Sequence, residues 1–312
     1  MPTQLFEKKQ VILAKIETTS GTDAVPVVGT DAMLIRSLTV TPLDQDVEAR
    51  NVVRPYYGNF ENIPVANRAM VEFEVELAGS GAAGTAPKWG VLMRGCGFSE
   101  TVTASTNTIY APISSAFESI TIYAFVDKVL HKLTGSRGSV SFDLTAKKLP
   151  VMKFKFTGLF SPVTDVTPGA PDYSAWQKPV AVSTAATTGL TVLGYSSLAL
   201  ESLTFDMANA IKHRVLVGAE YVALTDRTPA GQISFEAMKI ADKDWWTAMQ
   251  AATTGAIALQ HGQTAGNIVQ LSLPKVQLVK PSYKASDGIM MLNASINVLP
   301  VIGNDEVTLT VK

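Results

Sequence analysis

The chain has 312 residues, of which 46% are hydrophobic and only 17% charged, and its formal net charge is -1. This length supports one large or two medium hydrophobic cores. The near-zero net charge provides no basic field to hold nucleic acid through its phosphates, which argues against a role based on affinity for DNA and leaves open a role that needs indifference to DNA.

Cysteine content and hydropathy limit the cellular compartments in which the chain is expected. The single cysteine, Cys96, excludes an intrachain disulfide framework. The first residues, MPTQLFEKKQVILAKIE, are charged and lack the apolar centre of a signal peptide. No uninterrupted apolar run has the length of a membrane helix. We therefore expect a chain that is made in a reducing cytoplasm and not inserted into a membrane.

β-strand patterns dominate the chain from its N-terminal third onward. Residues 7–17 fit a helix, a strand or an extended arm equally well. Residues 70–77, MVEFEVEL, alternate apolar and acidic side chains, which is typical of a strand with one buried face. The same alternation or a β-rich composition predicts further strands at 118–125, 139–144, 152–156, 233–238, 268–273, 290–298 and 307–311.

Two short helices and one linker interrupt these strands. In residues 87–97 Pro87 suits the first helical position and Gly95 or Gly97 the end. Residues 161–195 are rich in Pro, Thr, Ala and Gly and predict a linker. The apolar stripe of the first helix is Trp89, Leu92, Met93 and Cys96, and Trp245, Ala248, Met249 and Ala252 repeat its spacing.

The two halves of the chain match each other weakly but in one order. The separation between matched positions shrinks along the chain, as shorter loops in the second copy would require. Four matched elements in one order indicate an internal duplication. The matched pairs are Ser37 with Ser202, Phe73 with Phe235, Trp89 with Trp245, and Gly138 of GSVSFDL with Gly288 of GIMMLNA.

Each copy holds a long connection after its first strand, at 42–69 and 206–231. Unpatterned connections of this length usually bind something or are disordered. A solvated flexible loop is the alternative, but three aromatic residues within five positions favour an ordered contact with another subunit or ring. Arginine and tyrosine are enriched at protein interfaces. The candidate contact residues are Arg50, Arg54, Tyr56, Tyr57 and Phe60.

No catalytic, cofactor or metal site is predicted. GSGAAG at 79–84 fits the spacing of a dinucleotide-binding loop, but the predicted helix begins beyond its third glycine, so a flexible loop is the better interpretation. The three histidines, at positions 131, 213 and 261, are far apart in sequence and show no metal-ligand spacing. Cys96 lies on an apolar stripe and is interpreted as a buried small hydrophobic residue.

A row of carboxylates follows one face of the strand at 70–77. Glu72, Glu74 and Glu76 could form an ordinary solvated face, neutralised by Lys153 and Lys155 on a neighbouring strand. They could instead form an acidic wall that faces something that must not adhere to it. The sequence does not decide between these two interpretations, and the solvated face is favoured.

Several segments together resemble a known family. ILAKIETTSGTDAVP, VEFEVELAGSG, APKWGVLMRGCGF, LHKLTGSRGSVSFDL and FKFTGLFSP occur in an order similar to the major tail tube proteins of long-tailed, non-contractile bacteriophages. The similarity covers residues 11–162, and the second half depends on the internal repeat. One departure is Asp127 followed by Lys128, where the family pattern would have Asp-Gly.

The resemblance implies a mainly β fold with two tandem tail-tube-type β-sandwich modules, each flanked by one α-helix. The first module would span 1–160, the linker 161–195 and the second module 196–312. Rings of three chains would then present six modules and stack into a tube. Double-stranded DNA would pass through it without specific binding.

The implied partners are further copies of the chain and other tail proteins such as the tail tip, tail terminator and tape measure. The protein would be located in the virion tail after assembly in the host bacterial cytoplasm. A receptor- or carbohydrate-binding adhesin is the alternative function, with Tyr56 and Tyr57 as exposed aromatics. An enzyme is the third possibility, and it lacks a catalytic constellation.

Overall fold

The computed structural model describes residues 4–312 and shows a mainly β chain, with 53% strand and 4% helix. Its strands pair antiparallel in large layered sheets, and its two helices are six residues each. The predicted fold class, a β-sandwich with two short helices, is therefore confirmed.

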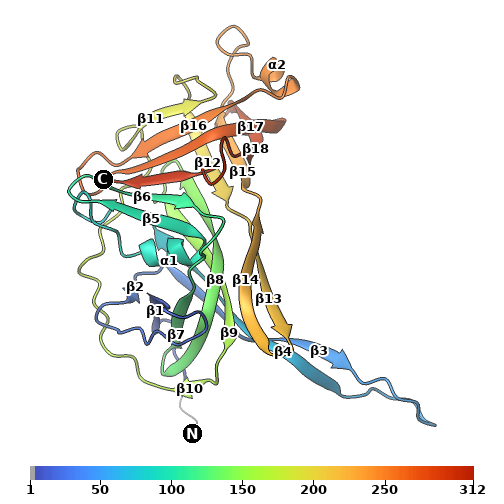
Figure 1. Cartoon of the computed structure of the whole chain (residues 1–312). Helices are drawn as coiled ribbons and strands as arrows, with labels where there is room; N and C mark the ends of the chain where they lie inside the picture. Colours follow the sequence, from blue (N-terminus) through green and yellow to red (C-terminus); the bar gives the residue numbers. More distant parts are fainter. Residues whose placement is uncertain (1–3) are drawn as a thin grey trace.

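A continuous antiparallel sheet, called here the main sheet, runs through both halves of the chain (Figure 1). Its spatial order is β3-β4-β9-β8-β12-β15-β18-β17. In this order the strands are β3 (Ser37–Ala49), β4 (Asn62–Glu76), β9 (Val151–Phe160), β8 (Val129–Thr145), β12 (Leu200–Asp206), β15 (Ala230–Glu236), β18 (Ile289–Val298) and β17 (Val269–Ser286).

Each half contributes four strands to the main sheet in the same spatial order. β3-β4-β9-β8 from the first half is followed by β12-β15-β18-β17 from the second. Phe73 of β4 and Phe235 of β15 occupy the same place in this order, and both are buried. The match of GSVSFDL with GIMMLNA is wrong, because the first lies in β8 and the second opens β18, whose counterpart is β9. Neighbouring half-buried strands carry the same alternation, so their sequences are easily exchanged in an alignment.

One face of the main sheet is apolar and carries the core. Val71, Phe73 and Val75 of β4 are buried, as the alternation predicts, and the glutamates between them lie on the opposite face. The core is continuous across both halves. It also includes Phe142, Phe154, Phe156, Leu203, Phe205, Ile233, Leu292 and Ile296.

Further strands form the layer opposite the main sheet. β7 pairs with the first part of β8 and carries β1 and β2 beside it. A second group runs β5-β6-β19-β17-β16-β11 and again joins the two halves. The bounds are β1 (Gln10–Ile16), β2 (Ala32–Met33), β5 (Phe98–Thr103), β6 (Asn107–Pro112), β7 (Ile120–Val126), β11 (Thr187–Val192), β16 (Thr254–His261) and β19 (Thr308–Val311). The short strand β10 (Thr164–Asp165) pairs with β8.

Two local expectations are resolved by these strands. The N-terminal segment that fitted helix, strand or arm is the strand β1. The turn between β7 and β8 uses Asp127 and Lys128 without a glycine. Asp127 has φ 55°, a left-handed conformation that aspartate tolerates better than most residues.

The helices are shorter than predicted but use the predicted stripe. In α1 (Gly90–Gly95) and its flanks, all four stripe residues of the first helix are buried. In α2 (Trp245–Gln250), Trp245 is buried, whereas Ala248 and Met249 are half-buried. Ala252 is exposed with φ 55°, because it follows the C-cap residue as Gly97 does in the first half.

Both long connections are β-hairpins. β3 and β4 extend far beyond the body and enclose the tip, residues 50–61 (Figure 1). The second connection forms β13 (Asn209–Leu216) and β14 (Ala219–Arg227), which pair only with each other. The sequence did not predict these strands, since most of their side chains are exposed and show no buried alternation.

We expect replacement of Trp89 by alanine to lower the free energy of unfolding by about 3–5 kcal/mol, because the indole is 1% exposed. Its Nε1 also donates to the carbonyl of Ala78 at 2.9 Å. The half-buried Trp246 provides the matched control, and its replacement should cost clearly less. Urea unfolding of both variants measures the difference, and equal costs would show that Trp89 is not a core anchor.

Candidate contact surfaces and the junction between the halves

The main sheet is joined in the middle by β8 and β12. Residues 141–145 of β8 pair antiparallel with residues 202–206 of β12. Phe142 lies directly opposite Phe205, and their rings stack with centroids 4.6 Å apart and planes 14° apart. Both rings are 2% exposed, so this pair ties the cores of the two halves together.

The C-terminal strand forms a second bridge in the opposite layer. β19 lies between β6 of the first half and β17 of the second and pairs antiparallel with both. Leu309 of β19 faces Tyr110 on one side and Leu271 on the other. The two halves are therefore connected through both layers.

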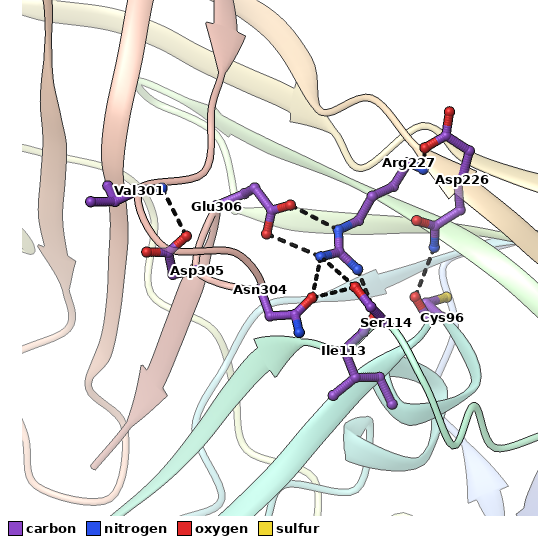
Figure 2. Close-up of polar contacts among 10 residues, drawn as sticks. Cys96, Ile113, Ser114, Asp226, Arg227, Val301, Asn304, Asp305 and Glu306 are labelled. Atoms are coloured by element: carbon purple, nitrogen blue, oxygen red, sulfur yellow. Dashed lines mark hydrogen bonds and ion pairs between the residues drawn. The ribbon is translucent and has the colours of Figure 1, made fainter.

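A half-buried ion pair holds the segment that leads into β19 (Figure 2). Arg227, at the end of β14, contacts Glu306 through Nε at 3.0 Å. Its Nη2 donates to the side-chain oxygen of Asn304 at 2.6 Å, and its Nη1 donates to the carbonyl of Ile113 in the first half. One guanidinium thus connects the hairpin, the C-terminal segment and the first half.

A second arginine makes the reciprocal contact. Arg137 of β8 donates through Nη1 to the carbonyl of Val222 in β14. Its Nη2 donates to the carbonyl of Phe117 at 3.1 Å. Asn209 of β13 also donates to the carbonyls of Cys96 at 2.7 Å and Gly138 at 2.9 Å. The β13-β14 hairpin is therefore fixed against the first half by contacts in both directions.

The glycine-rich segment at 79–84 belongs to the same junction. Gly79 donates its N–H to the side-chain oxygen of Asn267 at 2.7 Å, and Gly81 donates to the carbonyl of Gly266 at 2.8 Å. A Cβ on Gly79 would lie 2.1 Å from the Gly266 oxygen. The glycines let two backbone segments approach closely, so the segment is an ordered contact and not the flexible loop that the sequence favoured.

The five candidate contact residues all lie on the tip of the β3-β4 hairpin. Arg54 is brought between Tyr56 and Phe60, with its guanidinium carbon 4.8 Å and 4.0 Å from the two ring centres. Arg50 pairs instead with Glu61, across the base of the tip. Tyr57 projects into solvent with its side chain fully exposed. The cation–π stack gives the tip a defined shape.

The glutamate row lies on the polar face of the main sheet and is paired with cations. Glu72 contacts Lys155 of β9 at 2.7 Å, and the hydrogen bond from this lysine lowers the pKa of Glu72. Glu74 lies opposite Lys153 in the register of β4 and β9. Glu76 lies 3.9 Å from Arg36. The suggested neutralisation is therefore present as an ion pair for Lys155 and as a cross-strand position for Lys153, and whether this face lines a lumen stays a prediction.

The second half continues this polar face with mostly uncharged side chains. Thr204 lies opposite Asp143 of β8 and Gln232 of β15, and Ser295 follows on β18. Hydroxyl and amide groups thus extend the face beyond the junction. The face as a whole presents paired charges on one half and neutral polar groups on the other.

Cys96 and His261 are buried titratable residues that pack inside the protein. Burial raises the pKa of the Cys96 thiol, which fits its interpretation as a small core residue. His261 contacts the carbonyl of Val180 at 2.9 Å and Thr187 at 3.0 Å, and burial lowers its pKa. Among residues 4–312, no three His, Cys, Asp or Glu side chains are grouped to hold a metal ion. No helix within this range is both long and apolar enough to span a membrane.

Comparison with known proteins gives one family. The family model described as "Phage tail tube protein" matches residues 8–312 of this chain. No curated protein matches the sequence. The family match covers both halves and therefore includes the second half, which the sequence resemblance alone did not reach.

We expect replacement of Arg227 by methionine to lower the free energy of unfolding by about 3–5 kcal/mol, because it leaves Glu306 buried without its partner. Replacing both Arg227 and Glu306 by methionine and leucine should recover part of this loss. Arg50→Met is the matched control at an exposed ion pair and should cost less than about 1 kcal/mol. Equal losses for Arg227→Met and Arg50→Met in urea unfolding would contradict the role of Arg227 at the junction.

Proposed function

Because the chain belongs to the phage tail tube protein family, we propose that it polymerises as stacked rings of three chains whose channel conducts DNA into the host. Membership in this family makes the chain a structural tail tube subunit of the virion tail that associates with itself and with other tail proteins. The proposed tube belongs to a long-tailed, non-contractile phage and is assembled in the host bacterial cytoplasm. Its proposed partners among the other tail proteins are the tail tip, tail terminator and tape measure proteins.

The observation that carries the proposal is the order of strands in the main sheet. Each half supplies the same four-strand unit, and the two units join edge to edge through β8 and β12. Among residues 4–312, the outer edge of β3 pairs with no strand, and neither does the far edge of residues 278–286 in β17. Unpaired edges are templates for pairing with another chain.

Joining these two edges between copies repeats the contact that already exists within one chain. A heterologous contact of this kind closes into a ring when its rotation closes. The register of β8 and β12, transferred to the equivalent strands, brings residues 43–44 of one copy, where β3 carries a register shift, opposite Lys284 of the next. With two units in each chain, three chains supply the six units that the resemblance implies.

The division into modules supports the same arrangement. We assign 1–160 to the first module, 161–195 to the linker and 196–312 to the second module. The linker segment contributes β11 to the layer that β16 and β17 share. The segment thus connects two units that pack side by side rather than separating them.

The polar face of the main sheet suits the wall of a DNA channel. Lys155 is paired with Glu72, and Lys153 lies opposite Glu74, so the lysines of this face stand among carboxylates that would oppose the binding of phosphates. Glu72, Glu74 and Glu76 would then face the lumen, and the neutral groups of the second half would alternate with them around the ring. DNA would slide along such a surface without being gripped.

We expect the purified protein to form hollow tubes in electron micrographs. Removal of residues 50–60, the hairpin tip, should leave a folded monomer that does not polymerise, because the exposed tip contributes contacts between subunits. Circular dichroism and size-exclusion chromatography provide the folding control. Normal tubes from this variant would contradict a role of the tip, and a wild-type protein that binds glycans but never polymerises would favour the adhesin.

We further expect native mass spectrometry of the smallest closed ring to give a mass of about 100 kDa, three times the 33.3 kDa of the chain. The reason is that each chain carries two equivalent units. A ring of six chains would double this mass and would contradict the proposal.

A further inference from the structure

The two long hairpins occupy equivalent places in the halves but differ in their contacts. Each leaves the first strand of its four-strand unit and returns into the second. The β13-β14 hairpin packs on β8 and β9 of the preceding unit. The outer part of β3-β4, residues 44–68, projects away from the body (Figure 1). Among residues 4–312, no four-strand unit lies beyond β3 in the main sheet, so this hairpin has no equivalent surface to contact.

The strands that lead into the two hairpins show how the conformations differ. β12 ends at Asp206, and the chain bends at Ala208, which has φ 48° and donates its N–H to the Asp206 carboxylate at 2.7 Å. β3 instead continues into its hairpin, with register shifts between Thr41 and Asp44 and between Asp46 and Val47. Such irregularities bend a strand locally and mark a place where the hairpin can be redirected.

We propose that the β3-β4 hairpin of one copy docks on β17 and β18 of a second copy in the same ring, as β13-β14 docks on β8 and β9 within the chain. This inference rests on the proposed ring and names the partner surface of its hairpin. The docking continues an interface that the chain already contains. It places the outer part of β3 beside residues 275–286 of the neighbouring copy.

The charges of the two segments are complementary. Residues 44–49 of β3, DQDVEA, carry three acids and no base. Asp44 and Asp46 contact Arg68 of β4 at 2.7 Å and 2.9 Å, whereas Glu48 makes no ion pair within residues 4–312. Residues 275–286 of β17, KVQLVKPSYKAS, carry three lysines and no acid. Glu48 and Asp46 are exposed on the hairpin, and Lys280 and Lys284 are exposed on β17. Opposite charges that face each other across an interface steer association and fix its register.

The equivalent positions support the same alignment. Asn209 of β13 donates its backbone N–H to the Ser139 hydroxyl at 3.1 Å. The topological counterpart of Ser139 is Ser282, which is exposed. Counted along β3 from the counterpart of Asp206, the position equivalent to Asn209 is residues 46–47. The docked hairpin therefore brings Asp46 close to Ser282 and to the lysines on either side of it.

A carbodiimide cross-linker, which joins lysines to carboxylates at zero length, tests this docking on the wild-type tubes. We expect mass spectrometry to find cross-links from Asp46 or Glu48 to Lys280 or Lys284 in tubes and not in monomers. Because the contact lies within a ring of three, the covalent products that contain these links should stop at three chains. The double variant Lys280→Ala/Lys284→Ala removes the reactive amines, so loss of the cross-links in this variant confirms which lysines formed them.

Tubes that carry no such cross-link would overturn the docking and leave the proposed function intact. Lys147 and Lys148 lie in the turn between β8 and β9, at the end of the main sheet opposite the hairpin tip. Hairpin carboxylates cross-linked to these lysines, or ladders of products beyond three chains, would indicate contact between rings and would also overturn the docking. Failure of the protein to form tubes would contradict the proposed function itself. In that case the same links, sought in small oligomers, decide the docking separately.

Discussion

The pairing of β8 with β12 is the contact on which the rest of the structure depends. It converts two four-strand units into one sheet and brings Phe142 onto Phe205. Burial of two aromatic rings in a stacked cross-strand pair favours one register, since a shift of one strand by one residue would turn its ring to the polar face. The bridging strand β19 and the arginines at 137 and 227 then hold this arrangement from the opposite layer and from the hairpin.

The same pairing explains what the chain offers to other copies. Within residues 4–312, a unit that joins its neighbour edge to edge leaves one open edge at each end of the main sheet, at β3 and at residues 278–286 of β17. Long open edges are usually a hazard for a monomer, and the proposed ring would pair them with each other. The proposed ring adds no new kind of contact, because it repeats between chains the pairing and the docked hairpin that one chain contains.

The sequence predicted the parts of the fold that have one buried and one exposed face. Alternation located β4, β8 and β9, and the stripe that begins at Trp89 located α1. It did not predict the strands of the two hairpins, because side chains exposed on both faces leave no period to detect. The order of the repeat was correct for Phe73 and Phe235 but failed for β8 and β18, where half-buried strands look alike.

The junction between the two halves could not be predicted from the sequence for a different reason. Phe142 and Phe205 each look like an ordinary inward residue, and nothing in the sequence shows that they meet. Arg137 binds backbone carbonyls, which leave no pattern in the sequence, and Arg227 pairs with Glu306 at a separation of 79 residues that no local charge pattern reveals. The glycines at 79–84 were visible in the sequence as a possible binding loop. Glycine is equally required where two backbones approach closely, so the sequence alone did not show which role they have.

The most direct test of this account is a cryo-electron microscopy map of the tube at a resolution that separates strands. The account predicts three chains in each ring and a continuous inner sheet in which β17 of one chain pairs with β3 of the next. A ring of six chains with the second half on the outside, or an inner wall in which β3 and β17 remain unpaired, would contradict it.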